Sequence, residues 1–225
     1  MARIENHKYS IEEAFRECFY IVPDYQREYV WTDKEVHQLL EDIGEQIDAG
    51  TTREYFIGTV LVSPTDQKNH YEVIDGQQRL TTFFLLLCAL KHLFQGEPQR
   101  QMISGLISTS YVDSDGEVRT NLKLEPRYES AGEVMAKLVE LDADPQTVRA
   151  GIQASGIASF GSLENLVNAY STLYRYGQAP RASPQVGGAG HSGRSLQAGL
   201  SIGRRIRWKH SAKFRCRWRV CGSST

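Results

Sequence analysis

The sequence Val-Ile-Asp-Gly-Gln-Gln-Arg-Leu-Thr-Thr, residues 73–82, joins an apolar strand to a long apolar helix and decides the fold expected around it. The strand ends near Ile74, Asp75 and Gly76 form a turn, and the apolar pattern predicts a helix over about residues 80–94. A glycine lets the backbone approach a ligand closely, and the unpaired N–H groups at a helix start attract anions. The stretch therefore predicts a strand–turn–helix anion site.

Three polar side chains in this stretch suit phosphate chemistry. The planar guanidinium of Arg79 matches phosphate oxygens, whereas Gln77 and Gln78 can each donate and accept hydrogen bonds to a base, a sugar or a positioned water. A purely structural interpretation stands beside this one: Asp75 caps the helix, and Arg79 makes an ion pair. These residues alone leave both interpretations open.

Composition places the chain among globular proteins. Its 225 residues suffice for one large domain or two small ones, and 40% hydrophobic with 24% charged residues is typical of a soluble protein. No stretch approaches the about 20 apolar residues of a membrane span, and the polar residues 1–10 do not resemble a signal peptide. Four cysteines without a CxxC pair favour a reduced, cytoplasmic protein with no membrane partner.

The charges are divided sharply along the chain. All 27 Asp and Glu residues precede residue 177, whereas residues 177–225 carry 10 Lys and Arg with 8 Gly and 7 Ser. Such a composition does not build a core, so we expect this tail to be disordered. It is either a basic arm for nucleic acid or the product of a frameshift, and the abrupt loss of every acid favours the frameshift.

Hydrophobic periodicity predicts the other elements and an α+β fold class. Thr32 and Glu35 form the capping box of an amphipathic helix that runs to about residue 49. Two strands, residues 55–62 and 70–74, form an antiparallel hairpin. The remaining predicted elements are a helix over 11–17, strands over 19–22 and 121–125, and helices over 129–141 and 162–176.

Three segments together resemble one bacterial family. They are Ile21-Val-Pro-Asp-Tyr-Gln-Arg-Glu-Tyr-Val-Trp31, Tyr55-Phe-Ile-Gly-Thr59 and the stretch at residues 73–82. In order and spacing they are similar to the N-terminal domain of GmrSD-type modification-dependent restriction endonucleases, which also occurs in the phosphorothioate-sensing SspE proteins. The resemblance covers about residues 8–95, is weaker over 96–176 and is absent after 176.

The resemblance implies a ParB/sulfiredoxin-like core, a small mixed sheet flanked by helices. We accordingly expect residues 1–95 to form a ParB-like nucleotide-binding core. Residues 96–176 would be a mostly helical extension of the same domain, and residues 177–225 the disordered basic tail.

The resemblance also implies a site that binds and hydrolyses a nucleoside triphosphate, and no Walker A motif is present. The implied catalytic residues are Asp75, Gln77, Gln78 and Arg79, with Asp75 holding Mg²⁺. The implied nucleotide-binding residues are Tyr25, Gln26, Arg27, Gly58, Gly76 and Thr81. Structural alternatives are an ion pair of Arg27 with Glu28 or Asp24, and simple strand packing at Gly58.

The expected partners are a nucleoside triphosphate and DNA, which in this family is modified. Family members usually continue into an HNH nuclease domain, and His191 and His210 in the tail lack the context of one, so we expect no nuclease in this chain. The expected function is a regulatory nucleotide-hydrolysing domain of an anti-phage restriction system. The alternatives are a non-catalytic ParB-like DNA-binding module and an inactive truncated remnant.

Overall fold

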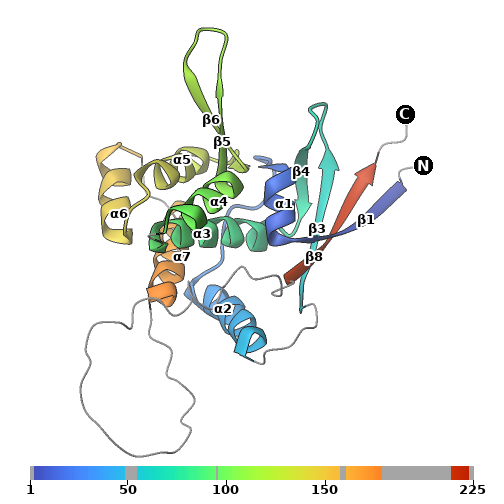
Figure 1. Cartoon of the computed structure of the whole chain (residues 1–225), viewed down its shortest axis with the longest axis horizontal. Helices are drawn as coiled ribbons and strands as arrows, with labels where there is room; N and C mark the ends of the chain where they lie inside the picture. The colour runs from blue at the N-terminus through green and yellow to red at the C-terminus, as the bar shows by residue number, and fades with distance from the viewer. Residues whose placement is uncertain (1–2, 49–54, 95, 158–160, 179–213, 223–225) are drawn as a thin grey trace, which may run out of the picture.

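A long central helix, α3 (Gln77–Leu93), organises the computed structural model (Figure 1). The structure describes residues 3–48, 55–94, 96–157, 161–178 and 214–222. Within these residues the other helices are α1 (Ile11–Glu17), α2 (Asp33–Asp48), α4 (Glu97–Ile107), α5 (Ala131–Leu141), α6 (Pro145–Ala154) and α7 (Gly161–Gln178). Helices α4 and α7 pack directly against α3, and α2 and α6 pack against α7.

Six strands of the described residues form one mixed sheet in the order β1-β8-β3-β4-β2-β7. They are β1 (Arg3–Ser10), β2 (Phe19–Val22), β3 (Tyr55–Pro64), β4 (His70–Asp75), β7 (Leu124–Pro126) and β8 (Phe214–Gly222). Strands β3 and β4 form the predicted antiparallel hairpin, whereas β2 runs parallel to both β4 and β7. Because β2 and β4 are parallel, the chain leaves both strands at the same edge of the sheet.

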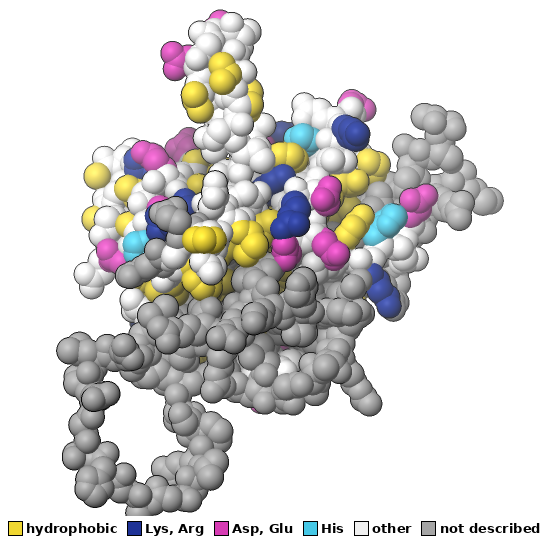
Figure 2. Space-filling view, in the orientation of Figure 1, with side chains coloured by type: hydrophobic (Ala, Val, Ile, Leu, Met, Phe, Trp, Pro, Cys, Tyr) yellow, Lys and Arg dark blue, Asp and Glu magenta, His cyan; other side chains and the backbone are white. Residues whose placement is uncertain are grey.

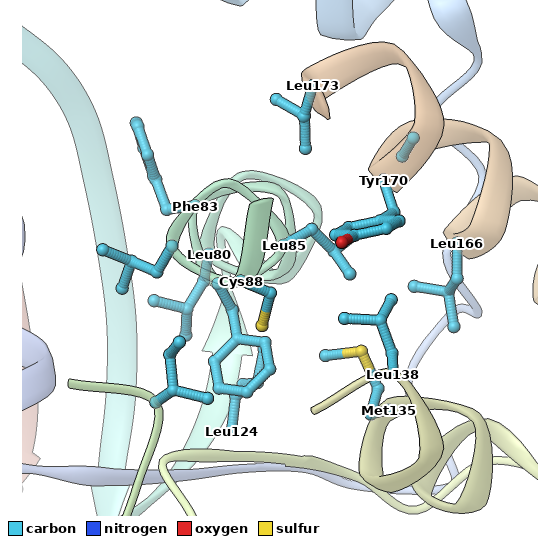
Figure 3. Close-up of a cluster of buried hydrophobic side chains, with 14 of the residues drawn as sticks. Leu80, Phe83, Leu85, Cys88, Leu124, Met135, Leu138, Leu166, Tyr170 and Leu173 are labelled. Carbon is cyan, nitrogen blue, oxygen red and sulfur yellow. The ribbon is translucent and has the colours of Figure 1, made fainter. Parts of the chain in front are cut away.

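Helix α3 is buried on nearly every side, as expected of a helix that is apolar all round. In Figure 3 its side chains leave the helix in several directions, with Leu85 directed toward Tyr170 of α7 and Phe83 away from it. Both residues belong to the single core cluster, which also includes Met135 and Leu138 of α5. No helix in the described part of the chain combines the length and apolar character that a membrane crossing requires.

The α+β class with a mixed sheet flanked by helices is confirmed, and most predicted elements are present. Helix α3 begins at Gln77 rather than near residue 80, so the polar motif forms its first turn. The predicted strand over 121–125 is divided at Lys123 between β6 (Val118–Leu122) and β7. The division arises because the Lys123 N–H bonds to the Ile107 carbonyl, outside both strands. The sequence did not predict β1, α4, α6 or a strand over residues 108–112.

The expectation of a disordered basic tail falls mostly on residues 179–213, which lie outside the described residues. Residues 214–222, however, form β8, which pairs antiparallel with β1 and parallel with β3. The sequence Phe-Arg-Cys-Arg-Trp-Arg-Val at 214–220 alternates apolar and basic residues, a pattern with the period of a strand. The prediction of disorder rested on the composition of the whole tail and did not take this short alternation into account.

A separate hairpin, β5 (Ser108–Val112) with β6, stands out from the body (Figures 1 and 2). It exposes Tyr111, Val112 and Val118, and a turn with Asp113 closes it. The hairpin therefore supplies surface positions remote from the core, which serve as controls for substitutions elsewhere.

Truncation of the core at Phe84 should strongly destabilise the fold. Phe84 is 0% exposed and packs near Phe15 of α1, so Phe84→Ala should lower the free energy of unfolding by about 3–5 kcal/mol. Urea unfolding measures the loss. Tyr111→Ala on the hairpin, where the side chain is 48% exposed, should change it by less than about 1 kcal/mol. Equal losses in the two variants would contradict this core.

Candidate functional site

The loop after β2, residues 23–32, and the first turn of α3 meet at one edge of the sheet. Gln26 Nε2 donates to the Ile74 carbonyl at the end of β4, at 3.1 Å. Gln77 and Gln78 reach in the opposite direction, from α3 to the backbone of the loop. Side-chain amides therefore join two segments that lie about 50 residues apart in the sequence.

Gln78 holds the loop at both ends of its amide. Its Oε1 accepts from the Val30 N–H at 2.8 Å, and its Nε2 donates to the Glu28 carbonyl at 2.8 Å. The side chain is buried, so these bonds also satisfy polar groups that water does not reach. Gln78 is thus occupied by the protein itself and positions the loop.

A buried hydroxyl chain supports the same junction. The Thr82 hydroxyl donates to the Gln78 carbonyl at 2.8 Å, so the Tyr29 hydroxyl must donate to Thr82 Oγ1, also at 2.8 Å. Burial raises the pKa of Tyr29 above its ordinary value. Tyr29 therefore remains protonated and serves the packing of the loop, not contact with a ligand.

Gln77 differs from Gln78 because one end of its amide lacks a partner. Its Nε2 donates to the Arg27 carbonyl, and since a carbonyl can only accept, this bond fixes the orientation of the amide. The Oε1 atom is then left buried without a hydrogen-bond partner among the described residues, on a side chain only 8% exposed. An orphaned buried acceptor costs about 1–3 kcal/mol, which a ligand that donates a hydrogen bond would recover.

The start of α3 lacks a side-chain cap. Gly76 occupies the N-cap position with φ +88°, and no side chain of the described residues caps the first turn. Asp75 is exposed and does not cap the helix, which overturns the structural interpretation of this residue. The N–H groups of the first turn, with the positive end of the helix dipole, are therefore available to an anion.

Arg79 lies over the backbone of β3. A Cβ atom at Gly58, where φ is +122°, would collide with the Arg79 guanidinium, so Gly58 makes room for this cation. Within the described part of the chain, neither Arg79 nor Arg27 forms an ion pair or a side-chain hydrogen bond, so the alternative ion pairs are absent there. Gly58 in turn packs against Arg79, beyond simple strand packing.

A pocket of about 380 Å³, here called the motif pocket, brings most of the predicted site residues together. It is lined by Gln26, Arg27, Trp31, Thr59, Ile74, Asp75, Gly76, Gln77, Gln78 and Arg79. Trp31, Thr59 and Ile74 were not predicted as site residues. Thr59 and Ile74 belong to the β3–β4 hairpin. Thr59 could be identified as a site residue only from the structure, where its carbonyl oxygen lies close to Gly76.

Three predicted site residues lie outside the motif pocket. Gly58 lines a neighbouring pocket of about 500 Å³, which shares Trp31 and Arg79 with the motif pocket. Tyr25 is 71% exposed and Thr81 is buried within α3, and neither lines either pocket. The described residues contain no group of three or more His, Cys, Asp or Glu side chains placed to bind a metal, and Asp75 is the acid that lines the motif pocket.

Comparison with known proteins gives one family. A family model described as the N-terminal domain of the GmrSD restriction endonuclease matches residues 7–177, more than half of the chain. A search among curated proteins found no match. The matched region contains the loop after β2, the hairpin and α3, so it covers both sides of the motif pocket.

Substitution of Gly76 should reveal the close approach of the turn to β3. Gly76 and Gly116 have similar positive φ values, +88° and +82°, but only Gly76 has neighbours: a Cβ there would lie 2.9 Å from the Thr59 carbonyl oxygen. Gly116→Ala should lose about 1–2 kcal/mol through backbone strain alone, and Gly76→Ala distinctly more. Thermal or urea unfolding measures both, and equal losses would show that this contact does not constrain the turn.

Proposed function

The chain belongs to the family of GmrSD restriction endonuclease N-terminal domains, and on this basis we propose that it binds and hydrolyses a nucleoside triphosphate as the regulatory module of a DNA restriction system. The observation that carries the proposal is the buried Gln77 Oε1 at the uncapped start of α3, which has no hydrogen-bond partner among the described residues and whose side chain lines the motif pocket with Arg79. A buried acceptor without a partner lowers the stability of the fold, and such a departure from complete pairing is expected where a ligand binds.

Positive groups in the motif pocket suit a polyphosphate. The free N–H groups of the first α3 turn, Arg79 and Arg27 all line it, against one carboxylate, Asp75. Phosphoryl hydrolysis depends mainly on neutralising charge on the phosphate oxygens and on holding the attacking water. We assign the two arginines to the phosphate oxygens.

The two glutamines have different roles in this proposal. Both amide ends of Gln78 are engaged with Val30 and Glu28, so Gln78 positions the loop that carries Arg27. Gln77 keeps its acceptor oxygen for a ligand, and a water that donates a proton to Oε1 would be oriented by it. We therefore assign water orientation to Gln77.

Asp75 fits the expected Mg²⁺. The ion typically binds through one or two protein carboxylates, with phosphate oxygens and waters completing its shell. Asp75 is exposed within the motif pocket and supplies one such carboxylate next to the proposed phosphate site. When bound there, Mg²⁺ would neutralise charge on the phosphate oxygens.

A DNA contact is the second part of the proposed function, and Tyr25 is the residue that favours it. It is an exposed aromatic side chain that lines neither pocket, although it precedes Gln26 and Arg27 of the motif pocket. An exposed aromatic ring can stack on a base. Residues 1–176 carry 27 acids against 16 Lys and Arg, so the contact is confined to a local surface.

Removal of the Arg79 guanidinium should weaken nucleotide binding without unfolding the chain. Charge-assisted hydrogen bonds contribute about 1.5–3 kcal/mol, so Arg79→Ala should weaken triphosphate affinity at least about tenfold, measured by calorimetry on the full chain. Arg175→Ala, which removes an exposed arginine on α7, should leave the affinity unchanged. Unaltered affinity in Arg79→Ala would refute the assigned site.

Replacement by leucine should mainly lower the hydrolysis rate at Gln77 and mainly lower the free energy of unfolding at Gln78. Gln77→Leu should lower the rate of triphosphate hydrolysis about 10²–10³-fold, because it removes the water acceptor, and should weaken affinity less, through the lost bond to the Arg27 carbonyl. Gln78→Leu should lower the free energy of unfolding, because the Val30 N–H and the Glu28 carbonyl lose their partners. Steady-state kinetics with urea unfolding compares the two, and full turnover by Gln77→Leu would place water orientation elsewhere.

A further inference from the structure

A second pocket lies next to the motif pocket, on the polar side of α2. It has a volume of about 500 Å³ and is lined by residues of α2, by Phe56, Ile57 and Gly58 of β3, and by Trp31 and Arg79. We call it the α2 pocket. Trp31 and Arg79 line both pockets, so a ligand held by Arg79 in one can extend into the other. Either volume alone lies within the usual range of about 300–1,000 Å³ for small-molecule sites.

The two pockets differ in charge. The motif pocket has two arginines against one carboxylate, whereas the α2 pocket pairs Arg79 and Lys34 with Glu35 and Asp42. Hydrogen bonds from the Thr32 side chain and backbone lower the pKa of Glu35, so this carboxyl is ionised at neutral pH. A polyphosphate is therefore favoured in the motif pocket, and a neutral group in the α2 pocket.

The α2 pocket also has flat apolar surface. Phe56 is a large hydrophobic side chain that is 56% exposed, and the half-buried indole of Trp31 lines the same pocket. Aromatic side chains exposed in a pocket of this size are suited to stack on a planar ring, and such stacking does not depend on which base is present.

We propose that the α2 pocket takes the base and ribose of the nucleotide whose phosphates occupy the motif pocket, with Phe56 as the stacking surface. This inference rests on the proposed function and adds the place of the nucleoside to it. Arg79 lies at the boundary of the two pockets, where a nucleotide joins its ribose to its phosphates. Gly58 keeps the boundary open, because a side chain there would push against the Arg79 guanidinium.

Two side chains of α2 give the pocket a means of distinguishing bases. Gln38 Nε2 donates to Asp42 Oδ1 at 2.9 Å, which fixes the amide and leaves Gln38 Oε1 and Asp42 Oδ2 as acceptors. Neither of these oxygens has a hydrogen bond within the described part of the chain. Asp42 and Gln38 therefore select for ring N–H or amino groups, and the preference among bases depends on them.

The test compares nucleotides with inorganic tripolyphosphate, which has the phosphates alone. Calorimetry on the full chain with Mg²⁺ gives the ratio of the two affinities. Phe56→Ala should lower this ratio about tenfold, as expected when one base loses a stacking partner. Asp42→Ala should reduce the differences in affinity among the four ribonucleoside triphosphates. Tyr111→Ala, which removes a similarly exposed ring on the hairpin, should leave the ratio unchanged.

The outcomes separate this inference from the proposed function. If the wild-type chain binds tripolyphosphate as tightly as any nucleotide, or if Phe56→Ala leaves the ratio unchanged, the α2 pocket does not hold the nucleoside and the phosphate site still stands. If the wild-type chain binds neither ligand, the proposed function itself fails. A fall in the ratio that Phe56→Ala produces and Tyr111→Ala does not would support the nucleoside site.

Discussion

The parallel pairing of β2 with β4 is the constraint on which the candidate site depends. Phe19 aligns with His70 and Ile21 with Glu72, so both strands end at the same edge of the sheet. One strand continues into the loop with Gln26 and the other into α3. An antiparallel pairing would send the two segments to opposite edges, and the glutamines of α3 would not reach the loop.

The contact between α3 and the loop buries polar side chains, and the apolar core around α3 offsets the stability lost by burying them. Helix α3 starts with two buried glutamines at its first turn and continues with an almost entirely apolar surface packed against α4 and α7. Buried amides are tolerated when both ends are hydrogen-bonded, as in Gln78. Gln77 satisfies only one end, and a departure of this kind from complete pairing is expected at a functional site.

Local patterns in the sequence predicted the elements that depend on neighbouring residues. The hairpin of β3 and β4, the capping interaction between Thr32 and Glu35, and the apolar helix after Gly76 were all readable from short windows. The missed helix α6 also had a local signal, since Asp144 caps it and Pro145 occupies its first position.

Features set by distant contacts were not predictable in this way. The parallel pairing of β2 joins segments about 50 residues apart, and β8 joins the sheet from the far end of the chain. Lys123 is buried over the Phe19 ring and donates to the Arg16 carbonyl, and nothing in its neighbouring sequence indicates that environment. The absence of a cap from Asp75 likewise follows from the turn geometry at Gly76, since an Asp before a helix usually favours a cap.

Under the proposed function, the residues of the motif Asp75-Gly76-Gln77-Gln78-Arg79 have separate structural and ligand-binding roles. Gly76 allows the turn to approach β3, Gln78 holds the loop, and Arg79 is placed by the space that Gly58 leaves. Gln77 has both roles, because one end of its amide holds the Arg27 carbonyl while the other has no hydrogen-bond partner among the described residues. The amide is rigid, so the orphaned oxygen and the loop that carries Arg27 cannot be displaced independently of each other.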